Sequence, residues 1–121
     1  MNSLYIAVLL IGVMKPTAYR SVTAQTDDSP FYTSTGEHVS CHGVAVSQDL
    51  LAKNGGPLRY GDLLYVEGVG FKFVNDCMAR KNRQAIDIWV SSKAEEHEFW
   101  HRFKNKKVRV WIVSPVQLDV R

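Results

Sequence analysis

Two aspartates lie where predicted strands would hold them among apolar side chains. Asp87 interrupts the apolar run 85–90, and Asp76 comes shortly after the alternating run 71–74. Because side chains alternate along a strand, Asp87 shares a face with Trp89, whereas the isoleucines on either side of it point the other way. A half-buried carboxyl group has a raised pKa. A raised pKa lets an aspartic acid act as a general acid near neutral pH.

Trp89 offers a flat apolar surface of the kind on which sugar rings stack. Together with Asp87 it indicates acid chemistry on a carbohydrate. A structural role is the alternative, in which Asp87 caps a loop or pairs with Arg80 or Arg83. The residue types alone leave both interpretations open.

The elements that must position these residues are short strands at regular spacing, which are typical of a compact, mostly β barrel with one or two short helices. A helix is predicted over 92–103, with Ser92 as its cap and two phenylalanines four residues apart. One helical turn is predicted after Ser47. Residues 25–43 are rich in Thr, Ser, Asp and Gly and are predicted to form a long loop. The predicted strands are 17–24, 44–46, 63–67, 71–74, 85–90 and 107–113.

The size and composition of the chain predict one globular domain. Its 121 residues are too few for two full domains, and a hydrophobic content of 45% with a net charge of +3 excludes disorder as the main state. Cys41 and Cys77 are too few for a disulfide framework and lack zinc-site spacing, so they form either one bridge or two free thiols. Basic residues concentrate in 80–109, which is either a solvated face or a contact for an anionic polymer.

The N-terminal segment begins with an unbroken run of 11 apolar residues, 4–14. This is the length of a signal-peptide core, and 22–24 has the small residues of a cleavage site. No Lys or Arg precedes the run, however, and cleavage there would remove Tyr19 from the domain. Translation starting at Met14 and a buried first strand are the alternatives. No stretch reaches the roughly 18 apolar residues of a membrane span.

Several short motifs carry a resemblance to a known family when they are read in order. They are Thr17-Ala18-Tyr19; Thr26-Asp27; Thr33-Ser34-Thr35-Gly36; Val44-Ala45-Val46; Tyr60-Gly61-Asp62 with Leu64-Tyr65-Val66-Glu67-Gly68; Asn75-Asp76 with Met78; Ile86-Asp87-Ile88-Trp89; and Val108-Arg109-Val110-Trp111-Ile112. From residue 17 to residue 113 the chain resembles the 3D (three-aspartate) domain of MltA-type lytic transglycosylases and of small stationary-phase cell-wall proteins. The resemblance divides the chain into a leader or mis-assigned start (1–16), the domain (17–113) and a tail (114–121).

The resemblance implies a double-psi β-barrel that cleaves the β-1,4 bond between N-acetylmuramic acid and N-acetylglucosamine and closes a 1,6-anhydro ring. Asp87 would be the acid and base, and Asp76 its catalytic neighbour. Tyr19, Thr35 and Trp89 would contact the substrate. No metal or other cofactor is implied.

One position departs from the family's pattern, because Ser47 stands where its first aspartate is expected. Either Asp49 takes over that role and contacts the substrate, or the chain has two of the three aspartates. A non-catalytic, glycan-binding barrel is therefore the alternative function.

The implied partner is the glycan strand of peptidoglycan, bound by a monomer, and neither nucleic acid nor a stable membrane span is expected. The N-terminal run predicts export to the periplasm or cell envelope. A start at Met14 would instead leave the protein in the cytoplasm until lysis.

Overall fold

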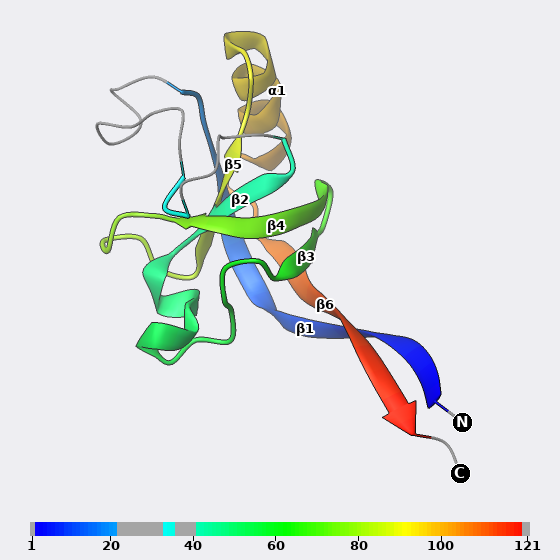
Figure 1. The fold of residues 1–121 in the computed structure, drawn as a ribbon. Coiled ribbons are helices and arrows are strands. Elements are labelled where there is room, and N and C mark those ends of the chain that lie inside the picture. Colours follow the sequence, from blue (N-terminus) through cyan, green and yellow to red (C-terminus); the bar gives the residue numbers. More distant parts are fainter. Residues whose placement is uncertain (1, 22–32, 36–40, 120–121) are drawn as a thin grey trace.

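The computed structural model describes residues 2–21, 33–35 and 41–119. The fold is mostly β, with one helix and two short 3-10 turns (Figure 1). In chain order the elements are β1 (Asn2–Tyr19), β2 (Gly43–Val46), η1 (Gln48–Leu50), η2 (Ala52–Asn54), β3 (Leu63–Val66), β4 (Gly70–Cys77), β5 (Ala85–Trp89), α1 (Lys93–Phe103) and β6 (Val108–Asp119).

The strands form one mixed sheet that closes in a ring in the order β1-β5-β2-β4-β3-β6. The pairs β1/β5 and β2/β4 are parallel, and the other four pairs are antiparallel. Parallel neighbours cannot be joined by a tight turn. Strands far apart in the sequence therefore lie side by side, and β5 runs between β1 and β2.

The strands and α1 share one apolar core. Each of the six strands contributes at least one buried side chain, and α1 adds Phe99 and Phe103, which lie on one face of the helix because they are four residues apart. Alternation explains which residues point inward: in β3, Leu64 and Val66 are fully buried and Tyr65 is exposed. Each such buried aliphatic side chain stabilises the fold by roughly 1.5–3 kcal/mol relative to an exposed one.

The predicted hairpin and the predicted helix are confirmed. β3 and β4 pair antiparallel, and α1 begins at Lys93 with the Ser92 hydroxyl accepting a hydrogen bond from the N–H of Glu95. The helical turn predicted after Ser47 is instead two 3-10 turns. Leu51 between them has extended backbone (φ −82°, ψ 142°), which no continuous helix can contain.

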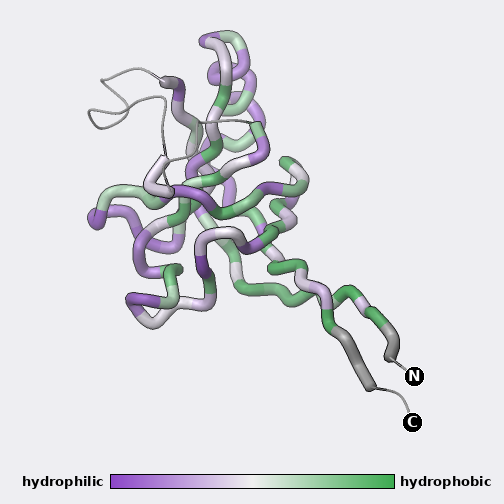
Figure 2. Tube along the Cα trace, viewed as in Figure 1, coloured by the Kyte–Doolittle hydropathy of each residue, from purple (hydrophilic) through white to green (hydrophobic). Residues whose placement is uncertain are grey.

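The first strand is longer than the sequence predicts, since β1 begins at Asn2 and pairs with β6 along most of its length. The predicted domain boundaries at 17 and 113 therefore fall inside β1 and β6. Within this strand Met14 and Pro16 are fully buried, whereas the side chains of Leu4 to Leu10 are exposed. Beyond the core the two strands project as an apolar arm (Figures 1 and 2).

Other predictions concern residues outside the described ones, including the cleavage site at 22–24 and the motif Thr26-Asp27. Cys41 and Cys77 are free thiols. None of the helices in the described part of the chain has the length and apolar character needed to cross a membrane.

Candidate functional site

Both predicted acids lie in one row that crosses four adjacent strands. Asp87 in β5 pairs with Thr17 of β1 on one side and with Ala45 of β2 on the other. Ala45 in turn pairs with Asp76 of β4. Residues paired across a sheet point to the same face, so the row places Thr17, Asp87 and Asp76 on one side of the sheet. The residues that flank Asp87, Ile86 and Ile88, point into the core as predicted.

Asp76 joins this row because of a β-bulge. The pairing of β2 with β4 skips Asn75, so that Ala45 stands opposite Asp76. Without this extra residue every later side chain of β4 would point to the opposite face. The side chain of Asn75 is buried against Gly43, where an added Cβ would lie only 2.4 Å from the Asn75 Nδ2. Glycine at 43 therefore makes room for the bulge.

Asp87 is largely buried, and its carboxyl group accepts a hydrogen bond from a neutral hydroxyl group. The Thr17 hydroxyl donates a hydrogen bond of 2.7 Å to its Oδ1. Among the described residues no arginine or lysine forms an ion pair with Asp87, so the alternative pairing with Arg80 or Arg83 is not observed. Burial, assisted by the nearby charge of Asp76, raises the pKa of Asp87 to about 6 although the Thr17 hydrogen bond favours the carboxylate.

Asp76 occupies a more polar setting. Its Oδ1 accepts hydrogen bonds from the Ser34 backbone N–H (3.0 Å), the Ser34 hydroxyl (2.5 Å) and the Cys77 backbone N–H (2.9 Å). Hydrogen bonds from donors stabilise a carboxylate. Within the row, the Asp76 carboxyl is thus held by hydrogen-bond donors from two segments, whereas the Asp87 carboxyl is held by Thr17 and has a raised pKa.

Two aromatic side chains extend the row. Tyr19 of β1 pairs with Trp89 of β5. This pair lies two residues beyond the Thr17/Asp87 pair, so its side chains point to the same face of the sheet. Burial and the charges of both aspartates raise the pKa of Tyr19, so its phenol stays protonated. The Trp89 indole Nε1 donates to the Ser21 hydroxyl over 2.9 Å, which orients the indole ring.

The remaining predicted residues are placed differently. Thr35 is exposed in the turn that carries Ser34, and its hydroxyl lies 2.9 Å from that of Thr33. Asp49 lies in η1, where it accepts hydrogen bonds from the Gln84 backbone N–H (3.1 and 3.4 Å). Burial alone would raise the pKa of Asp49, but hydrogen bonds lower it, and the bond with Ser47 has the largest effect among them. Asp49 thus ties η1 to the loop before β5 rather than joining the row.

Ser47 has a structural role of its own. It is completely buried, and its hydroxyl accepts a hydrogen bond of 3.0 Å from the Ala85 backbone N–H. A buried aspartate here would bring an uncompensated charge into the core. Ser47 is thus neutral, and it joins the end of β2 to β5 and also hydrogen-bonds to Asp49.

Sequence analysis missed three residues near the acids: Thr17, Ser34 and Tyr60. Burial and a hydrogen bond with Cys77 raise the pKa of Tyr60 to about 12, with Ser34 and Asp76 close by. All three lie in motifs that carry the family resemblance, 17–19, 33–36 and 60–62. The contacts themselves could not be read from the sequence, because they join positions 42 and 70 residues apart.

The chain matches no protein-family model and no curated protein. In the part of the chain that the structure describes, no group of three or more His, Cys, Asp or Glu side chains could hold a metal ion. The arrangement of groups in the row is consequently the basis on which a function can be proposed.

Proposed function

We propose that the protein is a lytic transglycosylase that cleaves peptidoglycan glycan strands. One observation carries the proposal: Asp87 is a largely buried aspartic acid that has no ion pair with any described residue, has a pKa of about 6 and shares its row with a second aspartate. Such a group is protonated often enough near neutral pH to act as a general acid.

The proposed reaction uses one carboxyl group twice. The Asp87 carboxyl donates its proton to the oxygen that bridges the two sugars, and the bond from that oxygen to C1 of N-acetylmuramic acid breaks. The resulting carboxylate then takes the proton of the 6-hydroxyl of the same sugar while O6 bonds to C1. Because the nucleophile is part of the substrate, its high effective concentration replaces a positioned water. The distinct acid and base of ordinary glycosidases are not required.

The neighbours of Asp87 support this cycle. Asp76, held as an acceptor by Ser34 and Cys77, repels negative charge and keeps the proton on Asp87. The Tyr19 phenol and the Trp89 indole lie on the adjacent line of the same face. There they offer a sugar a hydrogen-bond donor and an apolar surface.

The test is incubation of the full chain with purified peptidoglycan, followed by mass spectrometry of the soluble products. We expect 1,6-anhydro-muropeptides from the wild type and none from Asp87→Asn. Asp62→Asn is the matched control, since Asp62 accepts a hydrogen bond from the Arg59 N–H in a turn and the amide oxygen can still accept it. Reducing-end products, or equal yields from Asp87→Asn and wild type, would refute the mechanism.

We infer as a second candidate a non-catalytic glycan-binding protein, which the buried Ser47 favours because the family resembled by the sequence has an aspartate there. Sedimentation with peptidoglycan without release of anhydro-products would select this candidate. Trp89→Ala should then reduce the sedimented fraction, whereas Asp87→Asn should leave it unchanged.

We further propose that the ring of strands is a double-psi β-barrel. The two parallel pairs in an otherwise antiparallel ring of six strands support this topology. The experiment is an experimentally determined structure of the full chain, and a ring with a different strand order would overturn it.

A further inference from the structure

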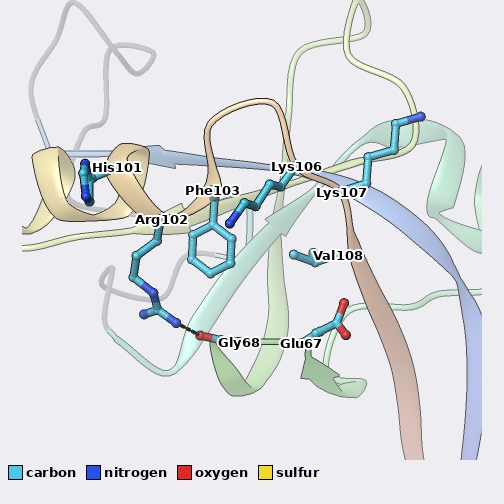
Figure 3. Close-up of a pocket in the computed structure, with 8 residues that line it drawn as sticks. All are labelled: Glu67, Gly68, His101, Arg102, Phe103, Lys106, Lys107 and Val108. Atoms are coloured by element: carbon cyan, nitrogen blue, oxygen red, sulfur yellow. Dashed lines mark hydrogen bonds between the residues drawn. The ribbon is translucent and has the colours of Figure 1, made fainter.

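A basic pocket lies at the end of α1, built from a part of the chain that the Thr17–Asp87–Asp76 row does not use. It has a volume of about 370 Å³ and lies between the last turn of α1, the segment that leads into β6 and the turn that joins β3 to β4 (Figure 3). Its lining residues are Glu67, Gly68, His101, Arg102, Phe103, Lys106, Lys107 and Val108.

The single acid of the pocket is already neutralised. Arg109 donates to the Glu67 carboxylate through Nε (2.9 Å), Nη2 (2.6 Å) and its backbone N–H (3.0 Å). These bonds lower the pKa of Glu67, so its carboxylate stays ionised and bound to Arg109. In contrast, Arg102, Lys106 and Lys107 form no ion pair within the described residues. The pocket therefore carries a surplus of positive charge.

Arg102 is held in position before any ligand binds. Its Nη2 donates to the Gly68 carbonyl oxygen over 2.8 Å, and its guanidinium lies 4.9 Å from the centre of the Phe103 ring. Gly68 has φ +76°, and an added Cβ would lie 3.2 Å from that ring. Glycine thus permits both the turn and its close approach to Phe103. One of the guanidinium's five N–H donors is used in this contact.

The two lysines that line the pocket point in different directions. In Figure 3 the Lys106 side chain extends across Phe103 toward Arg102, and Lys107 points the opposite way. The C-terminus of a helix carries only about half a negative charge, which is less than the combined charge of these three cations. Helix capping therefore does not account for the cluster.

We propose that this pocket binds a phosphoryl group. A phosphoryl group carries up to two negative charges and several strong acceptor oxygens, which suits a guanidinium and an ammonium that approach from different sides. Phe103 and Val108 line the same pocket, so an organic group bonded to the phosphoryl group would meet an apolar wall there. The group is either a free phosphate monoester or a phosphodiester within a polymer, and the site is independent of the proposed reaction at Asp87.

The test is an NMR titration of backbone amides in the full chain at fixed pH and ionic strength. Inorganic phosphate should produce saturable shifts at Gly68 and Lys106 that chloride does not produce. Lys106→Gln should weaken phosphate binding about fivefold to tenfold, because it removes a cation that forms no ion pair with any residue the structure describes. Lys53→Gln is the matched control, since this exposed lysine lies in η2 and removes the same charge outside the pocket.

Two further ligands identify the source of the phosphoryl group. Tighter binding of glycerol 1-phosphate supports a monoester, and tighter binding of diglyceryl phosphate supports a diester. Equal shifts with chloride, or equal losses in Lys53→Gln and Lys106→Gln, would overturn the proposal.

Discussion

Asp87 is subject to opposing influences on its proton. Burial and the charge of Asp76 favour the protonated carboxyl, and the hydroxyl of Thr17 favours the carboxylate. The balance puts the pKa at about 6, where both forms are populated. A group that must donate a proton and then take one back needs both forms to be accessible.

The pKa of Asp87 should respond in opposite directions to changes at its two polar neighbours. Thr17→Val removes the hydrogen bond to the carboxylate and should raise this pKa, whereas Asp76→Asn removes the repelling charge and should lower it. A carbon-13 NMR titration of the Asp87 carboxyl measures both effects.

The pH dependence of activity should follow the same pKa. In the wild type, anhydro-product formation should decline as pH rises through about 6, and this midpoint should move with each variant. Shifts in the same direction for both variants would contradict the assignment.

The raised pKa also makes stability depend on pH. The folded protein binds this proton more tightly than the unfolded chain, whose carboxyl has a pKa of 3.8, so the stabilisation is fully present below 3.8 and is lost as pH rises through about 6. At 1.36 kcal/mol per pH unit the loss is about 3 kcal/mol. Asp87→Asn should lack this loss and should therefore be more stable than the wild type at pH 8 but not at pH 3.5. Urea unfolding at the two pH values measures the difference, and parallel pH profiles would contradict it.

At the scale of elements, the bulge in β4 decides whether the two aspartates can act together. Asn75 shifts the alternation of β4 by one residue, and Gly43 leaves the space that its side chain fills. The bulge thus links the packing of β2 against β4 to the position of Asp76.

Gly43→Ala should destabilise the protein by about 1–3 kcal/mol, because its Cβ would overlap the buried Asn75 side chain. Asn75→Ala should restore part of that loss in the double variant, since it removes the group that clashes. Denaturant unfolding of the wild type, the two single variants and the double variant gives the coupling free energy between positions 43 and 75. Additive effects would show that Asn75 does not occupy the space beside Gly43.

The sequence predicted the positions of β2 to β5 and of α1, because alternation and helix caps are local signals. It did not predict that β1 begins at Asn2 or that β6 continues to Asp119. It also predicted that Asp87 and Trp89 share a face, since both lie on one strand. It could not predict the bulge at Asn75, which depends on the partner strand, or the contact of Ser34 with Asp76 across 42 residues. The place of Asp49 was missed for the same reason, since its partner is the backbone of Gln84.

At the scale of the whole molecule, a ring with a buried core carries a two-stranded arm that adds little to that core. The side chains of Leu4 to Leu10 are exposed, whereas Met14 and Pro16 further along β1 are fully buried. Residues 2–7 of β1 pair with β6 alone, because β3 pairs with β6 only from Val110 to Val113. Exposed apolar side chains in such an isolated pair of strands contribute little stability. The boundary of the stable unit should therefore lie between residue 7 and residue 14, upstream of the boundary at 17 predicted from the sequence.

Deletion of residues 2–7 should change the free energy of unfolding by no more than about 1 kcal/mol, because it removes both the entropic cost of ordering these residues and their cross-strand contacts. Met14→Ala should instead destabilise the full chain by about 2–5 kcal/mol, since it leaves a cavity in the shared core. Leu4→Ala, at the far end of the same strand and 70% exposed, is the matched control and should have almost no effect. Urea unfolding compares the three variants with the wild type. A large loss on deletion would mean that β6 depends on the arm, and the stable unit would then include the entire first strand.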